Sequence, residues 1–352
     1  MKLLILKTSL FVLPALLIYN FNKRIYRDGQ GDLIRAGYVY DNPSPRDAID
    51  ALSDLEKQYS ELSAIDLKEP QSFDVFTIGD SFSDQDRFGY QNFLAQKNLS
   101  VLNLTKFLNG RNPIQRTIEL INGDFFDRIQ VKIVVLQTIE RSTMRRCATI
   151  DFDRAIAVDS LASHITKRKL KGSYIPKKVD LFSHNTLRAP LINLQYSFHP
   201  NPAHSKTCVA PIAGANLFTN DPNRLLFYYH DLTRINRKND KKEIDMVHDV
   251  LTKLNAKFQA KGIQLIVMVC PDKYDIYYPF IKDKENFVKP TFFDYYNGLN
   301  KEYVDAPVYD ALMREVGYTK DLYYFDDSHW SSVGASLAAE EVYKMMLISG
   351  LK

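Results

Sequence analysis

The sequence has few cysteines and little net charge, and both scarcities exclude classes of protein. The three cysteines, Cys147, Cys208 and Cys270, lie far apart without metal-site spacing, and their odd number argues against a disulfide framework. The net charge of +4, from 46 basic and 42 acidic residues, is too small to indicate a nucleic-acid surface, and no nucleic-acid-binding motif is present. The 352 residues, 45% hydrophobic and 25% charged, have an ordinary globular composition.

Long apolar runs are also scarce, and the one that could cross a membrane lies at the N-terminus. Residues 3–21 are mostly apolar, and this length is near the ~20 residues that span a bilayer. No small-x-small cleavage site follows, so we interpret residues 1–22 as an uncleaved signal anchor, with a buried N-terminal helix as the alternative. Lys23, Arg24 and Arg27 behind the run outnumber Lys2 and Lys7 at its front end. By the positive-inside rule alone, these flanks favour a cytoplasmic C-terminal domain.

The alternation of apolar segments predicts an α/β protein with a doubly wound parallel sheet. The run at 131–137 is nearly continuous in apolar residues, as buried parallel strands are. The other predicted strands are 73–78, 99–104 and 263–269, with 322–325 either a short strand or an extended loop. The predicted helices are 45–62 (capped by Ser44), 86–97, 113–122, 241–261, 291–302, 307–316 and 331–348.

These elements suggest a domain organisation. Residues 23–69 are expected to form a linker and an N-terminal helix, and residues 70–352 a catalytic domain. Residues 151–238 fit the alternation poorly and are interpreted as an irregular insertion, either a cap over the site or a partner surface. The basic run at 167–178 within it is typical of a solvated face.

Gly79-Asp80-Ser81 ends the first predicted strand abruptly. Such a turn can present a serine nucleophile at the carboxyl end of a strand. The alternative is an ordinary helix N-cap, a position that Ser and Asp both favour, so the tripeptide alone does not decide between the two. A base elsewhere in the chain is needed.

A candidate base lies in the C-terminal stretch YYFDDSHWSSVGA, residues 323–335. A histidine can take the proton of a serine hydroxyl, and a carboxylate can hold the histidine in the required tautomer. Asp326 and Asp327 stand three and two residues before His329. Because ligands of open α/β sheets bind at the strands' carboxyl ends, we expect this loop to lie beside Ser81.

The pair "IGDSFS" and "DDSHW" resembles the SGNH hydrolase superfamily, and within it the AlgX/AlgJ-like group of polysaccharide O-acetyltransferases. The resemblance covers about residues 70–142 and 240–350 and implies a sheet with flavodoxin-like layering. The Asp-x-His-Trp pattern of that group favours Asp327 and draws attention to Trp330, whereas the Asp-x-x-His pattern of the wider superfamily would select Asp326. Both aspartates remain candidates.

The resemblance also suggests residues for the oxyanion and the substrate. Gly110 and Asn112 follow the second strand where the superfamily offers an oxyanion glycine, although Gly110 is equally consistent with an ordinary turn. The Gly-x-Asn-Asp motif expected after the third strand is missing. Its place is taken by Ile139-Glu140-Arg141, which is similar to the acetyltransferase-like group, and Glu140 and Arg141 are candidates for binding substrate.

The activity that the resemblance implies is O-acyl (acetyl) transfer to a bacterial surface or exported polysaccharide through an acyl-serine, without a cofactor or metal. The implied partners are a glycan acceptor and a membrane-bound O-acyltransferase that supplies the acyl group. Such proteins act outside the cytoplasm, so the resemblance overrides the flanking charges and predicts a membrane-anchored, periplasmic catalytic domain. The alternatives are an SGNH esterase or deacetylase for carbohydrate or lipid esters, and a non-catalytic scaffold in polysaccharide export.

Overall fold

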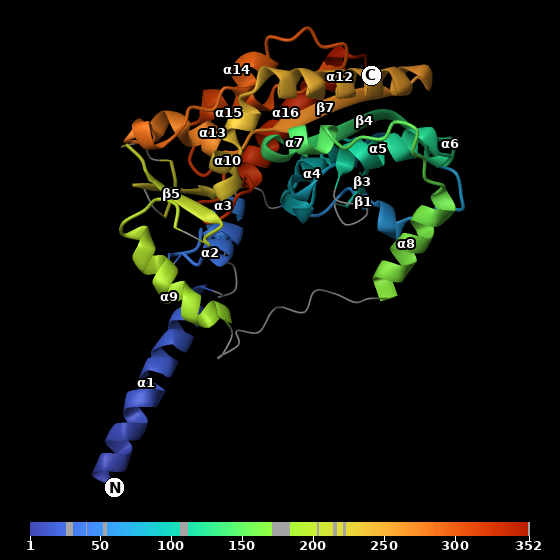
Figure 1. The fold of residues 1–352 in the computed structure, drawn as a ribbon. Helices are drawn as coiled ribbons and strands as arrows, with labels where there is room; N and C mark the ends of the chain where they lie inside the picture. The colour runs from blue at the N-terminus through green and yellow to red at the C-terminus, as the bar shows by residue number, and fades with distance from the viewer. Residues whose placement is uncertain are drawn as a thin grey trace.

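The structure is a computed structural model, and it describes residues 1–25, 31–39, 41–51, 55–105, 112–170, 184–202, 204–213, 217–220 and 223–350. The N-terminal helix α1 (Lys2–Ile25) projects from the rest of the described chain (Figure 1). Its 18-residue apolar window has a mean hydropathy of 1.8 and no buried residue, so it is long and apolar enough to cross a membrane.

The centre of the fold is a six-stranded sheet in which every neighbouring pair is parallel. The strand order is β1-β3-β2-β4-β7-β8. The strands are β1 (Ser60–Glu61), β2 (Gln71–Ile78), β3 (Val101–Leu104), β4 (Ile129–Ile139), β7 (Gln264–Cys270) and β8 (Val304–Asp305). The predicted doubly wound α/β sheet is confirmed. Because β2 lies between β3 and β4, the chain reverses its direction across the sheet there, and the carboxyl ends of β2 and β4 flank the switch point.

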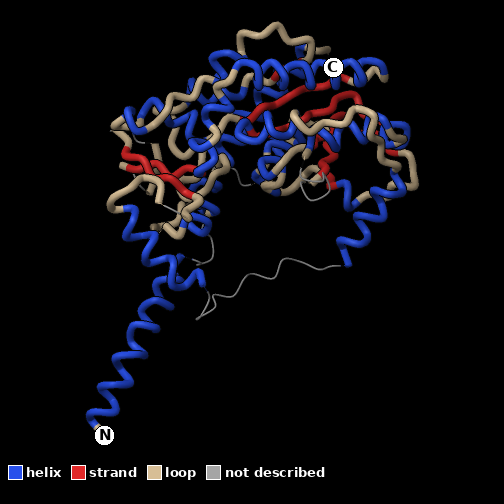
Figure 2. The backbone as a smooth tube through the Cα atoms, viewed as in Figure 1, coloured by secondary structure: helices blue, strands red, loops and turns tan. Residues whose placement is uncertain are grey.

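Helices cover both faces of this sheet, and Figure 2 shows its strands between them. Val75 of β2 faces one core cluster, and its neighbour Phe76 faces the other, as the two-residue period of a strand requires. The first face packs against α4 (Tyr90–Ala95) and α16 (Ser332–Ile348). The second packs against α5 (Pro113–Asn122), α6 (Phe125–Arg128) and α12 (Lys241–Ala260).

Several predicted elements differ from the observed ones. The helix expected over 45–62 is observed as α3 (Arg46–Asp50), and its N-cap is Pro45 rather than the predicted Ser44. It cannot reach residue 62 because Ser60–Glu61 forms β1. The helix expected over 86–97 is a 3₁₀ turn, η4 (Asp86–Phe88), followed by α4. Residues 322–325 form a loop with one bridge, between Tyr323 and Trp330. The helices predicted at 291–302 and 307–316 are α14 (Phe292–Tyr296) and α15 (Val308–Glu315).

The region predicted as an irregular insertion contains more regular structure than expected. Its strands β5 (Thr207–Pro211) and β6 (Arg224–Tyr228) form a separate antiparallel pair. Its helices are α8 (Val158–Leu170), α9 (His184–Tyr196), α10 (Tyr229–Thr233) and α11 (Ile235–Lys238). Most of the basic run at 167–178 lies outside the described residues.

The remaining elements of the described chain lie outside this region. They are α2 (Asp32–Gly37), α7 (Glu140–Cys147), α13 (Lys273–Tyr277), η2 (Leu62–Ala64), η3 (Ser81–Ser83), η5 (Tyr278–Phe280) and η6 (Lys284–Asn286).

Candidate active site

The turn after β2 requires its glycine. A Cβ atom on Gly79 would lie 2.1 Å from Ser83 Oγ and 2.3 Å from Gln137 Oε1, so no larger residue fits without displacing them. The same Gln137 oxygen accepts hydrogen bonds from Asp80 N (2.9 Å) and Ser83 Oγ (3.0 Å). Gln137 lies on β4, so these contacts fasten the turn to the neighbouring strand and fix where Ser81 begins η3.

Asp80 is a structural residue of this turn. Its carboxylate accepts hydrogen bonds from Phe82 N (3.2 Å) and Ile139 N (2.8 Å) and pairs with Arg146 Nη1 at 2.6 Å. Burial alone would raise the pKa of Asp80, but the Arg146 guanidinium and these donors hold it below its usual value. An ionised Asp80 therefore joins the carboxyl ends of β2 and β4 beside Ser81.

Ser81, His329 and Asp327 form one hydrogen-bonded series. The distance from Ser81 Oγ to His329 Nε2 is 2.7 Å, and that from His329 Nδ1 to Asp327 Oδ1 is 2.6 Å. Asp327 Oδ1 also accepts the backbone N–H of His329 at 3.1 Å. The Phe82 ring lies 4.8 Å from the imidazole, centroid to centroid. A hydroxyl, a base and a carboxylate thus stand in the order that serine-based acyl transfer requires.

The charges around His329 favour a positive imidazole. Burial alone would lower the pKa of His329, but the Asp327 carboxylate, with a smaller contribution from Asp32, raises it above the usual value. Burial likewise opposes ionisation of Asp327, but His329 and then Arg46 hold the pKa of Asp327 well below its usual value. Asp327 is therefore an anion in the folded protein, and it stabilises the imidazolium that forms when His329 takes a proton.

The Asp326 carboxylate has partners other than His329. Its side chain is buried and accepts the Gly31 N–H at 2.7 Å and Arg46 Nη2 at 3.2 Å. Arg46 Nη2 also lies 3.0 Å from Asp327 Oδ2, and its guanidinium lies over the Tyr324 ring at 3.9 Å. One arginine therefore bridges the two aspartates, although only Asp327 contacts the imidazole.

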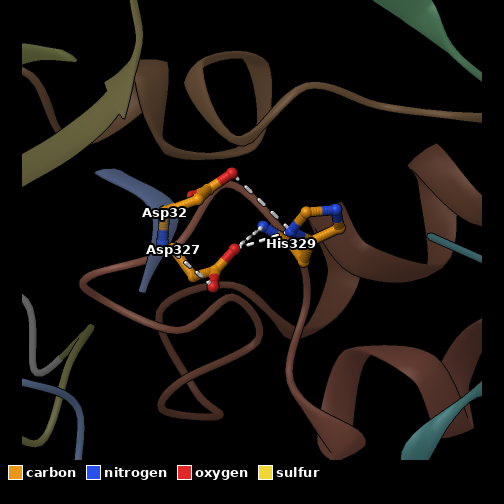
Figure 3. A group of neighbouring side chains, drawn as sticks. All are labelled: Asp32, Asp327 and His329. Atoms are coloured by element: carbon orange, nitrogen blue, oxygen red, sulfur yellow. Dashed lines mark hydrogen bonds and ion pairs between the residues drawn. The ribbon is translucent and has the colours of Figure 1, made fainter. Parts of the chain in front are cut away.

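A third carboxylate, Asp32 of α2, approaches from the N-terminal part of the chain (Figure 3). It accepts the backbone N–H and the hydroxyl of Ser328, each at 2.7 Å, and its Oδ2 lies 3.9 Å from His329 Nδ1. Its own N–H donates to Asp327 Oδ2 at 3.3 Å. Partial burial and the neighbouring Asp327 carboxylate raise the pKa of Asp32.

Lys273 holds the loop that carries these residues. Its side chain is fully buried, and Nζ donates to the carbonyl oxygens of Tyr324 (2.8 Å), Phe325 (2.7 Å) and Asp327 (3.2 Å). Each of the three N–H donors of the Lys273 ammonium group thus has a carbonyl acceptor. Burial lowers the pKa of Lys273 to about 7.

Glu140 and Arg141, predicted as substrate-binding candidates, belong to a buried ion-pair cluster. Arg141 Nη1 lies 2.7 Å from Asp272 Oδ1 and 3.4 Å from Asp231 Oδ1. Glu140 Oε1 lies 3.0 Å from Lys238 Nζ. Burial, followed by the neighbouring Asp272 carboxylate, raises the pKa of Asp231 to about 8. Both predicted residues lie just past the carboxyl end of β4, and each already has a buried partner of opposite charge.

Two groups of side chains among the described residues bring metal-ligand atoms together. In one, formed by Asp32, Asp327 and His329, both ring nitrogens of the histidine already have hydrogen-bonding partners, in Ser81 and Asp327. The other consists of Glu140, Asp272 and Asp275, whose oxygens lie 3.0, 2.8 and 2.8 Å from Lys238 Nζ. There a lysine ammonium supplies the positive charge that a metal would bring.

The remaining predicted site residues have other positions. Gly110 lies outside the described residues. Asn112 caps α5, because its side-chain oxygen accepts the N–H groups of Ile114 and Gln115, and its amide donates to Arg146 O. Trp330 is buried, with its ring 4.9 Å from that of Phe82, and its carbonyl accepts a hydrogen bond from Gln85. Asn112 is therefore a helix cap, and Trp330 is a core residue packed against Phe82, the neighbour of Ser81.

Comparison with protein families finds a match for the C-terminal part of the chain. Residues 223–350 match a protein-family model described as an SGNH hydrolase-like domain, acetyltransferase AlgX. The predicted resemblance to this family is confirmed for that segment, which contains Asp327, His329, Lys273 and the ion-pair partners of Arg141. Ser81 lies outside it, and the β4–β7 pairing joins the two halves in one sheet. No curated protein and no solved structure matches the chain.

Proposed function

We propose that this chain is an O-acyltransferase that moves an acetyl group to a hydroxyl of an exported polysaccharide through an acyl-serine at Ser81. The AlgX-type SGNH domain at residues 223–350 supports an enzyme of acetyl transfer to polysaccharide. The observation that carries the assignment of residues is the Ser81–His329–Asp327 series at the carboxyl edge of the sheet.

The first half-reaction acylates Ser81. His329 Nε2 takes the proton of Ser81 Oγ as the oxygen attacks the carbonyl carbon of the acyl donor. The tetrahedral oxyanion then collapses, the bond to the donor oxygen breaks, and the imidazolium returns its proton to the leaving alcohol. The product is an acetyl ester on Ser81 and a neutral His329.

The second half-reaction transfers the acyl group from Ser81 to the acceptor. His329 takes the proton of a sugar hydroxyl, which attacks the acyl-serine, and Ser81 leaves with the proton from the imidazolium. We assign the oxyanion donors to the backbone N–H groups of Ser81 and Gly110, and one such donor stabilises a transition state by about 2.7–4 kcal/mol. If water replaces the sugar, the same steps give an esterase.

The N-terminal contacts are part of the proposal. Asp32 holds Ser328 and adds negative charge near His329 Nδ1, while Arg46 fixes the orientation of Asp327. In this role Asp32 and Arg46 are positioning residues, which act through His329 and Asp327.

We also propose that α1 anchors the protein in the membrane and that the catalytic domain lies on the extracytoplasmic side. The length and hydropathy of α1 support its role as an anchor. The family match to an acetyltransferase of polysaccharide supports the extracytoplasmic side, where exported polysaccharide is found. A membrane-bound O-acyltransferase is the proposed acyl donor. A reporter enzyme fused after Lys352 tests the side, and activity of the fusion in the cytoplasm alone would contradict it.

An activated acetyl ester with p-nitrophenol as leaving group tests the chemistry. We expect an acetyl adduct on Ser81 by mass spectrometry, no adduct in Ser81→Ala, and an unchanged adduct in the control Ser63→Ala. Release of the adduct is then measured with and without a cello-oligosaccharide, a chito-oligosaccharide or an oligouronate. Acceleration by one acceptor, with acetyl recovered on it, supports the transferase. Release to water alone would identify an esterase, and an adduct on another residue would exclude Ser81 as nucleophile.

A further inference from the structure

The helix α9 carries an apolar face that no described part of the chain covers. Leu191 is 62% exposed and Leu194 is 61% exposed, and Phe198, just after the helix, is 73% exposed. These residues are three and four positions apart, so the two leucines share one helix face and Phe198 continues it. Elsewhere in the described chain beyond residue 25, the exposed large apolar side chains are Val288, Tyr318, Leu347 and Ile348. Contiguous exposed apolar surface usually marks a contact with another body.

The opposite face of α9 is firmly attached to the protein. Ala189 and Ile192 are buried. The Asn193 amide donates to the carbonyl of Tyr38, and the Tyr196 hydroxyl donates to Gly37 O at 3.2 Å. The outward position of the leucines therefore follows from how α9 is held at the end of α2.

The helix α9 is next to the proposed membrane anchor. Figure 1 shows α9 beside the C-terminal end of α1, and the two helices are in contact. Ile25 at the end of α1 is buried in the same core cluster as Ala189, and Phe21 packs against that cluster. The exposed large apolar side chains of α1 extend from Leu3 to Leu17.

This arrangement places α9 at the depth where a bilayer would end. If α1 spans the membrane with the ~20 residues that a bilayer requires, counted from its N-terminal end, its last turn, where Asn22 and Ile25 are buried, lies at the boundary between lipid and water. Lys23 and Arg24 in that turn are exposed and suit the phosphate headgroups. A helix held at that level with an outward apolar face has the form of an interfacial helix.

We infer that α9 lies in the surface of the bilayer that α1 crosses, with Leu191, Leu194 and Phe198 inserted at the boundary between headgroups and acyl chains. This inference rests on the proposed anchoring by α1. With a single helix as its attachment, the catalytic domain could swivel about the anchor. With α9 as a second attachment, its orientation is fixed, and α2, which carries Asp32, is held at a set height above the lipid.

Spin labels on the full-length protein in vesicles of phosphatidylcholine and phosphatidylglycerol test the inference. The native Cys147, Cys208 and Cys270 are buried, so a label reacts at an introduced cysteine. Three single variants are compared: Leu10→Cys in α1, Leu194→Cys in α9, and Tyr318→Cys, whose parent side chain is 90% exposed. We expect the labels at 10 and 194 to collide with lipid-soluble oxygen in preference to an aqueous nickel complex, and the label at 318 to show the reverse. Thermal unfolding of each variant checks that it is folded.

The outcomes separate the two proposals. If the label at 10 is in lipid but that at 194 is in water, the inference about α9 is wrong and the anchor stands. If both are in water, the anchoring itself fails. If the label at 194 shows spin–spin broadening that grows with the number of proteins per vesicle, a second copy covers α9, and the inference is again overturned.

Discussion

Asp32 Oδ2 lies 3.9 Å from His329 Nδ1, although the two residues belong to opposite ends of the chain. The segment that carries Asp32 also provides the Gly31 N–H for Asp326 and the Arg46 guanidinium for both aspartates. The loop of residues 322–331, here called the histidine loop, is thus held by the N-terminal segment and by Lys273. The predictions below test what these contacts do.

The first prediction separates the two adjacent aspartates. Asp327→Asn should reduce kcat by about 10⁴-fold, because an amide beside Nδ1 favours the wrong tautomer of His329. Asp326→Asn keeps an acceptor for the Gly31 N–H and does not touch the imidazole. It should therefore leave kcat within about tenfold and reduce the free energy of unfolding by about 1–3 kcal/mol. The measurements are single-turnover acylation of Ser81 and urea unfolding. The reverse pattern would identify Asp326 as the partner of His329, and small effects from both would exclude a Ser-His-Asp mechanism.

The second prediction concerns pH. His329 acts as a base only when neutral, so activity is lost as the pH falls through its pKa. The raised pKa of His329 therefore places the acid limb of the kcat/KM profile above 6.5, the ordinary value. The charged groups that act on it are Asp327 and Asp32, which raise the pKa of His329, and Arg141, which lowers it.

In Asp32→Asn, one of the two raising charges is gone, so the acid limb should move to lower pH while the fold is retained. Asp47→Asn is the matched control, since Asp47 is an exposed aspartate of the same N-terminal segment. Asp32→Glu should restore part of the shift. An acid limb that stays in place in Asp32→Asn would show that Asp32 has no electrostatic effect on His329.

The third prediction tests the fit of the N-terminal segment against the histidine loop. A Cβ atom on Gly31 would lie 2.1 Å from the backbone oxygen of Asp326, so Gly31→Ala must push the two segments apart. We expect at least a tenfold loss of acylation rate and a loss of about 1–3 kcal/mol in the free energy of unfolding, as overpacking usually costs. Gly298→Ala is the control, because its nearest neighbour would be at 3.5 Å. Equal activity of the two variants would mean that the segment does not position the site.

The parts of the fold that sequence could predict are those with local signals. The apolar run at 131–137 indicated a buried parallel strand, and it lies within β4. The helix at 113–122 had its cap, Asn112, and its first-turn proline in sequence, and α5 begins and ends at the predicted residues. Ser81 and His329 could be proposed together because each stands in a short motif, and the structure brings their side chains to hydrogen-bonding distance.

The parts that could not be predicted depend on contacts between distant segments. Asp32 follows Gly31 in a polar stretch that has the composition of a linker, and nothing nearby in sequence indicates that it meets Ser328. Lys273 follows a strand end, where a lysine is normally solvated, and its three carbonyl acceptors lie in the histidine loop. The edge strands β1 and β8 have two residues each, too few for any periodicity to show.

The sheet order has a consequence for the newly made chain. Ser81 and Asp32 are synthesised before the strand β7, which adds to β4, and before the loop with His329. Contacts between distant segments form late in folding, since the entropy of closing long loops must be overcome first. The nucleophile therefore stays without its base until residue 329 has been synthesised, and a chain interrupted before that residue carries a serine that cannot be acylated by this route.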